Sequence, residues 1–246
     1  MAKSNRKTRK QQHQQQHQDN DVIQLNSNQR RMRHVTLNPR NHRQEDYIQL
    51  LDNSEKHIIF AIGPAGTGKT LLGVLASIRA LQEGTIDKIV VTRPAISVDE
   101  QHGFLPGTLE EKMAPWTRPI FDIFQEYFNK KQIDNMLEDG MIEIAPLAYM
   151  RGRTFKNAFI VADEMQNATI SQMKMLLTRI GDGSRIAVTG DLAQHDRGYE
   201  ENGLKDFLTK LAKSQSKMIG MVEFQRQDVE RHPAVAEILK IYGDED

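Results

Sequence analysis

Cysteine is absent from all 246 residues of the chain. This excludes a disulfide framework, a zinc knuckle and a thiol nucleophile, and it is consistent with an intracellular setting. Long apolar runs are also missing, because the longest ones are the length of a strand and residues 1–18 contain no hydrophobic stretch. We therefore expect neither a transmembrane helix nor a secretory signal, and we expect a soluble, cytoplasmic protein without a membrane partner.

Charge is distributed unevenly along the chain, although the formal net charge is zero. Residues 1–43 hold ten lysines and arginines against two aspartates, a net charge of +8, so the remainder carries −8. The glutamine-rich run at 11–18 and the scarcity of large apolar residues before Val22 predict a disordered basic arm over residues 1–33, because such a segment cannot offset its own ordering entropy. The arm suits tethering to RNA or DNA, and a solubilising tail is the alternative.

The remaining residues, 34–246, have the length of a single domain. Short apolar runs alternate there with helical patterns, which predicts an α/β fold with a mostly parallel sheet covered by helices on both faces. The expected strands are His57–Ile62, Lys88–Thr92, Met141–Ala145, Ala158–Ala162, Arg185–Thr189 and Lys217–Phe224. The expected helices are Arg43–Leu51, Lys69–Gln82, Pro119–Phe128, Ile133–Glu138, Thr169–Ile180, Gly203–Lys213 and Asp228–Tyr242. Ligands of such sheets bind at the carboxyl ends of the strands.

A glycine-rich octet follows the first expected strand: Gly63-Pro64-Ala65-Gly66-Thr67-Gly68-Lys69-Thr70. It matches the phosphate-binding pattern G-x-x-x-x-G-K-[ST] at every fixed position, at a junction where backbone N–H groups and a helix N-terminus point at bound phosphate. The glycines let the backbone wrap the phosphates, Lys69 supplies a charge to the β- and γ-phosphates, and the Thr70 hydroxyl is suited to hold Mg²⁺. The alternative is a chance glycine-rich turn.

Two adjacent acids end another expected strand, where Ala158–Ala162 leads into Asp163 and Glu164. The first acid is suited to steady Mg²⁺ through its water shell, and the second to polarise a water for in-line attack on a γ-phosphate. The alternative for such a pair is a solvated turn. Its place about ninety residues after a complete phosphate loop favours the functional interpretation.

Polar residues also follow the expected strand Arg185–Thr189. Gln194 in this cluster is a candidate γ-phosphate sensor, and the alternative is a turn capped by aspartate. Arginines stand near two other strands, Arg93 after Lys88–Thr92 and the pair Arg151 and Arg153 before Ala158–Ala162. Arginines in such places suit phosphate, either of a nucleotide or of a polymer.

Taken together, several segments resemble the PhoH-like ATPases. The segments are the octet at 63–70, Thr92–Ala95, Gly103–Gly107, Ala145–Thr154, Asp163–Asn167, Gln172–Met175, Thr189–Asp191 and Asp228–Pro233. The resemblance covers roughly residues 38 to 242 and is more specific than the phosphate loop alone. It implies a RecA-like P-loop core that hydrolyses ATP and is distantly related to superfamily 1 helicases, whose Asp-Glu-x-Gln and Gly-Asp-x-x-Gln boxes these segments mirror.

The resemblance also shows what this chain lacks. No nuclease-like or RNA-binding domain is recognisable, and neither is the second RecA-like lobe that closes the ATP site in superfamily 1 helicases. We expect a neighbouring subunit to close the site with an arginine, in a homo-oligomeric ring that is six-membered by analogy with RecA-like relatives. Arg231 is the first candidate for this arginine, with Arg153 and Arg93 next. The alternative is a surface arginine paired with nearby acids.

These residues predict a Mg²⁺-dependent ATPase coupled to nucleic acid, with single-stranded RNA as the expected partner. Lys69 and the loop hold phosphate, Thr70 and Asp163 serve the metal, Glu164 activates water and Gln194 senses the γ-phosphate. The resemblance suggests Gln44 as an adenine-reading glutamine, and a surface residue of the first helix is the alternative. A regulatory or protein-remodelling switch without nucleic acid is a second hypothesis. A small-molecule kinase is a third, disfavoured because no lid or acceptor pocket is recognisable.

Other conspicuous residues favour structural roles. The methionine-rich stretch Met165–Met175 indicates a helix packed in the core rather than a ligand surface. The histidines show no metal-binding spacing, and His195 and His232 favour capping or packing. Trp116 follows a loop rich in glycine and proline, where docking against the core is favoured over stacking on a nucleobase.

Overall fold

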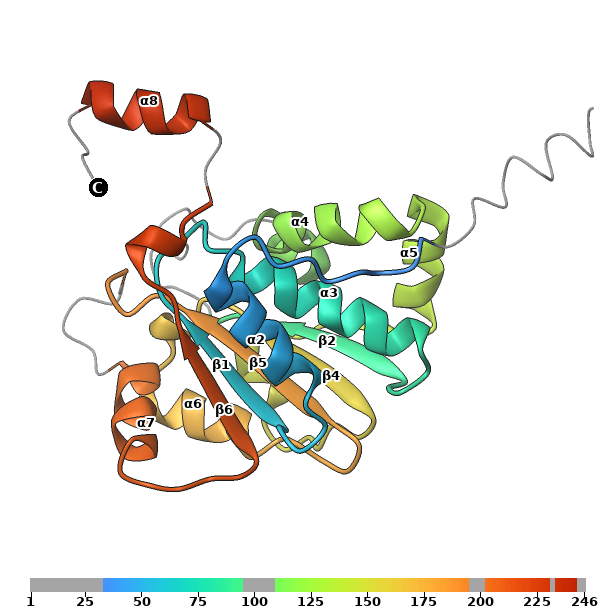
Figure 1. Cartoon of the computed structure of the whole chain (residues 1–246). Coiled ribbons are helices and arrows are strands. Elements are labelled where there is room, and N and C mark those ends of the chain that lie inside the picture. The colour runs from blue at the N-terminus through green and yellow to red at the C-terminus, as the bar shows by residue number, and fades with distance from the viewer. Residues whose placement is uncertain (1–32, 95–108, 195–201, 231–232, 243–246) are drawn as a thin grey trace, which may run out of the picture. The chain divides into compact units, whose positions relative to one another are not determined.

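The computed structural model describes residues 33–94, 109–194, 202–230 and 233–242. The predicted arm at 1–33 lies outside this part of the chain except for its last residue, so the arm and the domain division remain predictions. Within the described residues, six strands form one sheet in the order β3-β2-β4-β5-β1-β6, and every neighbouring pair is parallel (Figure 1). This sheet confirms the predicted α/β fold with parallel strands. Each helix among the described residues is too short or too polar to span a membrane.

The strands are short, and the central ones are buried on both faces. Their bounds are β1 Ile58–Ile62, β2 Lys88–Thr92, β3 Ile142–Ile144, β4 Ala158–Ala162, β5 Arg185–Gly190 and β6 Ile219–Glu223. All five residues of β4 are buried, as expected for a continuous apolar run in a parallel sheet covered on both sides. Strand β6 forms an edge and alternates between buried and exposed residues instead.

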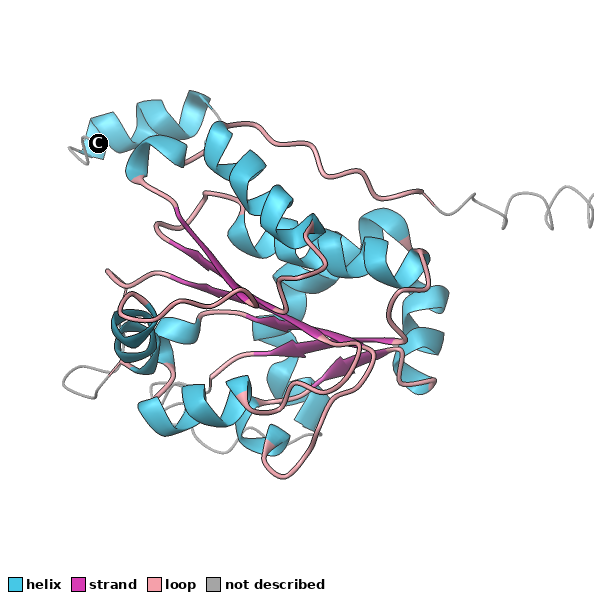
Figure 2. Ribbon diagram, turned by 60° about the horizontal axis from the view of Figure 1, so that its bottom comes forward, coloured by secondary structure: helices cyan, strands magenta, loops and turns pink. Residues whose placement is uncertain are grey.

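Helices cover both faces of the sheet, which lies between two layers of helices in Figure 2. One face carries α2 His42–Asp52, α3 Lys69–Gln82, α4 Leu109–Tyr127 and α5 Lys130–Glu138. The other carries the 3₁₀ turn η2 Leu147–Met150, α6 Ile170–Leu177 and α7 Gly203–Leu211. The 3₁₀ turns η3 Met165–Asn167 and η4 Arg226–Asp228 and the last helix, α8 Pro233–Tyr242, complete the described elements. Each helical layer buries its own apolar core against the sheet.

Three expected helices begin three or more residues away from the expected position. Helix α4 begins at Leu109 rather than Pro119. The later start was expected because prolines at 115 and 119 are typical of a loop, but the helix accommodates both of them. The last helix begins at Pro233 rather than Asp228, because the Asp228 side chain accepts a hydrogen bond from the Gln225 backbone N–H and closes a separate 3₁₀ turn. Helix α5 begins three residues before the expected position, at Lys130.

The methionine-rich stretch is not one helix. Residues Met165–Asn167 form a 3₁₀ turn, and α6 begins only after Thr169, whose hydroxyl accepts the Gln172 N–H while the Gln172 side chain accepts the Thr169 N–H. Met165 and Met173 are nonetheless fully buried, which confirms that these methionines pack in the core. The break matters for the site because η3 directly follows Asp163 and Glu164.

Candidate functional site

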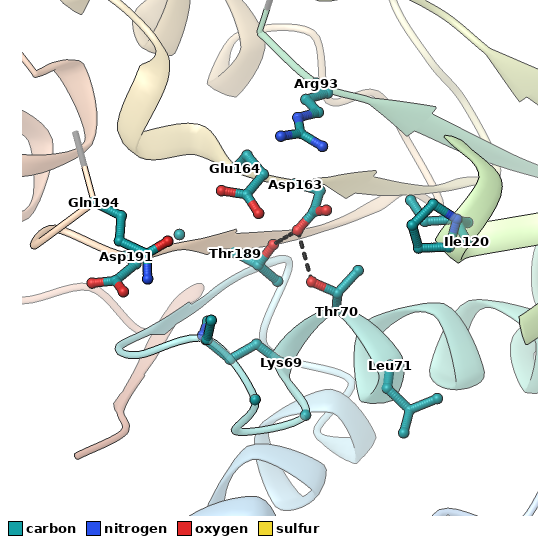
Figure 3. Close-up of a pocket in the computed structure, with 15 residues that line it drawn as sticks. Lys69, Thr70, Leu71, Arg93, Ile120, Asp163, Glu164, Thr189, Asp191 and Gln194 are labelled. Carbon is teal, nitrogen blue, oxygen red and sulfur yellow. Dashed lines mark hydrogen bonds between the residues drawn. The ribbon is translucent and has the colours of Figure 1, made fainter. Parts of the chain in front are cut away.

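A cavity of about 360 Å³ opens at the carboxyl ends of β1, β2, β4 and β5 (Figure 3). These four strand ends lie at one edge of the sheet because all strands run parallel. The cavity lining includes the glycine-rich loop with Lys69 and Thr70, Arg93 after β2, Asp163 and Glu164 after β4, and Thr189, Asp191 and Gln194 at and after the end of β5. The fold therefore gathers the residues of four separate sequence motifs around one cavity.

The glycine-rich loop has a backbone that requires its glycines. Gly66 and Gly68 both have a φ of 82°, in the left-handed region that favours glycine. Gly63 has a φ of 140°, and a Cβ there would lie 2.3 Å from the Phe224 carbonyl oxygen at the end of β6. The loop is thus pressed against the edge strand, and helix α3 begins immediately after it at Lys69.

The Lys69 ammonium group lies across the loop. Its Nζ donates to the Pro64 carbonyl oxygen at 2.6 Å and to the Thr67 hydroxyl at 3.2 Å. Burial lowers the pKa of Lys69, and the nearby carboxylates of Asp191, Asp163 and Glu164 act in the opposite direction. A buried ammonium that has only these weak acceptors is ready to exchange them for an anionic ligand.

Asp163 is held by two hydroxyl groups. The Thr70 Oγ1 donates to Asp163 Oδ1 at 2.7 Å, and the Thr189 hydroxyl donates to the same oxygen. Hydroxyl and carboxylate oxygens at this spacing fit Mg²⁺, which takes few protein ligands and keeps water and phosphate oxygens in its shell. Across the described residues no group of three or more His, Cys, Asp or Glu side chains could hold a metal by itself. Thr70 and Asp163 would supply part of the shell of a Mg²⁺ ion, whose remaining ligands would be water and phosphate oxygens.

Glu164 is placed by an unusual backbone conformation. It has φ 54° and ψ 37°, one of two non-glycine residues with positive φ in the described part of the chain. This conformation costs about 1–3 kcal/mol in an ordinary residue and persists where surrounding contacts impose it. It directs the Glu164 side chain into the cavity rather than along the following turn (Figure 3). Glu164 is therefore only partly exposed, and the interpretation as a solvated turn does not describe it.

Gln166 connects Glu164, which follows β4, to Asp191, which follows the neighbouring strand β5. Its Nε2 donates to Glu164 Oε2 at 2.5 Å, and its Oε1 accepts from the Asp191 backbone N–H at 3.1 Å. The side chain is 1% exposed. From the sequence, Gln166 was recognisable only as part of a matching segment, without a role of its own. The order β4-β5 in the sheet brings these partners together, and that order cannot be read from the spacing of the motifs.

Gln194 lies at the rim of the cavity, in a turn that Asp191 caps. Asp191 Oδ1 accepts from the Ala193 N–H at 3.0 Å, and the Asp191 carbonyl accepts from the Gln194 N–H at 3.1 Å. The aspartate-capped turn, the alternative to a sensor, is therefore present. It does not exclude the sensor, because the exposed Gln194 side chain also lines the cavity (Figure 3).

Gln44 is buried beneath the loop rather than on the surface of α2. It is 5% exposed, its Oε1 accepts from the Arg40 N–H at 2.9 Å, and its Nε2 donates to the Thr67 carbonyl oxygen at 3.1 Å. The interpretation as a surface residue is therefore wrong. Both ends of the amide bind the chain itself, so reading an adenine would require Gln44 to exchange at least one of these bonds.

The three arginines proposed as closing residues have different surroundings. Arg153 is occupied, because it forms a two-pronged ion pair with Glu143 and lies over the Phe155 ring at 4.5 Å. Arg93 lines the cavity of its own chain. Arg231 lies outside the described residues, as do His195 and His232, and the Trp116 side chain is likewise not described.

Comparisons with known proteins agree with the motifs. The family model described as "PhoH-like protein" matches residues 36–243. The chain is 45% identical over 202 residues to a PhoH-like protein of Bacillus subtilis, covering 81% of this chain and 61% of that protein. It is 44% identical over 202 residues to one of Synechocystis, covering 81% and 60%, and 41% identical over 208 residues to protein PhoH of Escherichia coli, covering 83% and 57%. The chain thus spans about three fifths of the length of these curated relatives.

A solved structure is also similar, although distantly. The Sulfolobus solfataricus SWI2/SNF2 ATPase core in complex with dsDNA aligns with 87% of this chain and 53% of its own, at a TM-score of 0.44 and 17% identity. A likeness at this level carries no conclusion about the ligand or activity of the present chain. The family is decided instead by the match over residues 36–243 and by the relatives above 40% identity. On these grounds the chain belongs to the PhoH-like protein family.

Proposed function

We propose that this protein is a Mg²⁺-dependent ATPase that couples ATP hydrolysis to single-stranded RNA. The observation that carries the ATPase proposal is the gathering of a phosphate loop, a hydroxyl–carboxylate pair and a partly buried glutamate around one cavity. Lys69 and the loop amides hold the β- and γ-phosphates, aided by the N-terminus of α3. Mg²⁺, when bound, neutralises charge on those phosphates, and Thr70 and Asp163 are the residues that would hold it.

Glu164 acts as the base that orients and polarises the attacking water. Three features support this role: the side chain points into the cavity, the backbone of Glu164 adopts a positive φ that is costly for a residue with a side chain, and Gln166 holds one of the two carboxylate oxygens. The other oxygen has no hydrogen bond to any described residue and is available to water. Gln194 stands at the rim, where the terminal phosphate of a loop-bound nucleotide would face it, which supports the role of sensor.

Gln44 contributes to nucleotide binding by supporting the loop from beneath. A Cβ at Gly68 would lie 2.9 Å from Gln44 Nε2, so the amide and the loop backbone are in close contact. Its bond to the Thr67 carbonyl ties the start of α2 to the loop. Nucleotide binding that moves Thr67 therefore moves α2 as well, whether or not Gln44 also contacts the base.

Coupling to RNA is supported by charge rather than by a described groove. The arm at 1–33 and the residues that follow it to 43 carry a net charge of +8, and such a segment is drawn to a polyphosphate backbone. Arg151, in the connection between η2 and β4, is exposed. We further propose cytoplasmic localisation and a homo-oligomeric ring, six-membered by analogy with RecA-like relatives, in which Arg231 of one subunit closes the site of the next.

RNA stimulation of ATP turnover tests the proposed function against a nucleic-acid-independent switch. We expect wild-type turnover to rise when single-stranded RNA is added at low salt, and to rise less with single-stranded DNA of the same sequence. The turnover rate of Lys69→Ala, which should not bind ATP, serves as the background rate. ATP turnover that no nucleic acid stimulates, together with no binding of RNA, would favour the switch. Transfer of the γ-phosphate to a small molecule in place of water would favour the kinase.

A further inference from the structure

Among the described residues that line the cavity, Arg93 is the one arginine. It follows β2 directly, is half-buried and reaches toward Asp163 and Glu164 (Figure 3). Its guanidinium group has no hydrogen bond or ion pair within residues 33–94, 109–194, 202–230 and 233–242, although three carboxylates line the same cavity. This contrasts with Arg153 and Arg185, whose guanidinium groups are committed to Glu143 and to backbone carbonyls.

The backbone of Arg93 is fixed even though its side chain has no partner among those residues. Its carbonyl oxygen accepts from the Leu147 N–H at 3.4 Å, and the preceding Thr92 carbonyl accepts from the Asp163 N–H at 2.9 Å. Pro94, which is buried, follows and restricts the chain further. A long cationic side chain is therefore presented from a rigid base, directly beside the strand that carries Asp163 and Glu164.

Sheet order indicates which part of a nucleotide Arg93 would meet. Strand β2 is three strands away from β1, about 14 Å at the usual strand spacing, with β4 and β5 between them. The phosphate loop follows β1 and the acids follow β4, so the chain of phosphates runs from the loop toward β4. Arg93 stands beyond β4, at the far end of that path, where a terminal phosphate rather than a base or sugar lies.

The charges around the cavity also favour a cation beside the terminal phosphate. Among the described residues, three carboxylates line the cavity, those of Asp163, Glu164 and Asp191, and Lys69 and Arg93 are the cationic side chains. Without Arg93, Lys69 and the proposed Mg²⁺ would face these acids with no cation on the β2 side, where charge on the terminal phosphate would develop. An arginine offers two N–H groups side by side, a geometry that matches the oxygens of a phosphoryl group.

From this geometry we propose that Arg93 contacts the γ-phosphate within its own chain and stabilises the charge that develops on it during hydrolysis. The inference rests on the proposed ATPase function and names a catalytic residue for it. The site then has an arginine of its own chain at the terminal phosphate. In the proposed ring, Arg231 of a neighbouring subunit would act in addition to Arg93 and not in its place.

The experiment compares Arg93→Ala with Arg118→Ala in the full-length protein. Arg118 is a matched control, since it is exposed on α4 and is not among the lining residues, although its neighbours Pro119 and Ile120 are. We expect Arg93→Ala to lower kcat about 10²–10³-fold while the Kd for ADP stays within about threefold, because the contact forms chiefly in the transition state. Arg93→Lys keeps the charge but loses the paired N–H groups, so its kcat should lie between those of wild type and Arg93→Ala. Turnover of Arg93→Ala equal to that of Arg118→Ala overturns the proposal.

A binding measurement gives a second readout that does not depend on turnover. ADP with aluminium fluoride imitates the transferring phosphoryl group, and we expect Arg93→Ala to bind it about 10²-fold more weakly than wild type. Unchanged affinity for this complex overturns the proposal even if kcat falls. If Arg93→Ala fails to fold, as its thermal unfolding would reveal, the same comparison is made with Arg93→Lys.

Mixing two inactive variants separates an arginine that acts within its chain from one that acts across an interface. In a mixture of Arg93→Ala and Glu164→Gln chains, every chain lacks either its own arginine or its own base, so we expect no recovery of activity. Recovery means that Arg93 serves a neighbour and overturns the in-chain assignment. A wild type that does not hydrolyse ATP at all overturns the proposed function, and the inference with it. A hydrolysing wild type with an unimpaired Arg93→Ala overturns the inference alone.

Discussion

Replacing Gln166 with leucine tests whether the bridge between β4 and β5 holds the site together. The change keeps a side chain of similar size in a position that is 1% exposed, and it removes the bonds to Glu164 Oε2 and to the Asp191 N–H. A bond to a charged group contributes about 1.5–3 kcal/mol, and a buried N–H left without an acceptor costs about 1–3 kcal/mol. Glu164 is partly exposed and regains water, so we take the lower part of each range and expect a loss of about 3 kcal/mol.

This loss is large enough to measure directly. For a domain of 150–250 residues, 1 kcal/mol lowers Tm by about 2–4 °C, so Gln166→Leu should melt about 6–12 °C below wild type. We also expect kcat to fall at least about tenfold with the Kd for ADP unchanged, because Glu164 loses the group that orients it. A wild-type Tm together with a wild-type kcat would show that the bridge carries neither stability nor orientation.

Gln166→Glu separates the two bonds of the bridge. The new carboxylate still accepts from the Asp191 N–H, but it places a second acid against Glu164. Two carboxylates in contact cannot both ionise freely, so the pKa of the pair rises. We therefore expect the rate of Gln166→Glu to increase with pH over a higher range than that of wild type. A pH–rate profile identical to that of wild type would mean that Glu164 is not the base.

Three further changes test the buried Lys69, the ion pair of Glu143 with Arg153 and the basic arm at 1–33. Lys69→Met should leave the Tm of the ligand-free protein at neutral pH no lower than that of wild type. Burial lowers the pKa of Lys69, so keeping the side chain charged destabilises the folded state at every pH below that lowered pKa. A clear drop in Tm would contradict this. Glu143→Gln should reduce stability by up to about 1 kcal/mol in denaturant titrations at neutral pH. Hydrogen bonds from Arg153 hold the pKa of Glu143 below its usual value. The stability difference between wild type and Glu143→Gln should therefore be fully present at pH values above the usual pKa and disappear as the pH falls through the lowered pKa. Deleting residues 2–33 should leave the Tm unchanged and reduce the salt dependence of RNA binding by about 0.7 for each phosphate that the arm would otherwise neutralise; an unchanged slope makes the arm a solubilising tail.

The sequence was most informative where a single local pattern decides the structure. Strands β2 and β4 have the predicted bounds, because each is a short apolar run between polar residues. The phosphate loop could also be predicted from the sequence, since its glycines are needed at positive φ and it lies between a strand and a helix. Helix α4 was harder because its prolines resemble a loop signal, and the start of α8 depended on a side-chain bond of Asp228.

Contacts between strand ends could not be predicted, because they depend on the order of strands in the sheet. Thr189 meets Asp163, and Gln166 meets Asp191, only because β5 lies beside β4. The direction of Arg93 into its own cavity follows from β2 flanking β4 on the other side. Parallel sheets of the same elements can be wound in several orders, and each order would bring different side chains together.

We propose that one cavity both binds ATP and hydrolyses it, with separate residues for the two tasks. The most direct measurement is the Kd for ATP with Mg²⁺ and the turnover rate of Lys69→Ala and Glu164→Gln, determined side by side. We expect Lys69→Ala to lose nucleotide affinity, whereas Glu164→Gln should bind ATP as wild type does and turn it over at least about 10²-fold more slowly. Equal loss of binding in both variants, or undiminished turnover in Glu164→Gln, would contradict it.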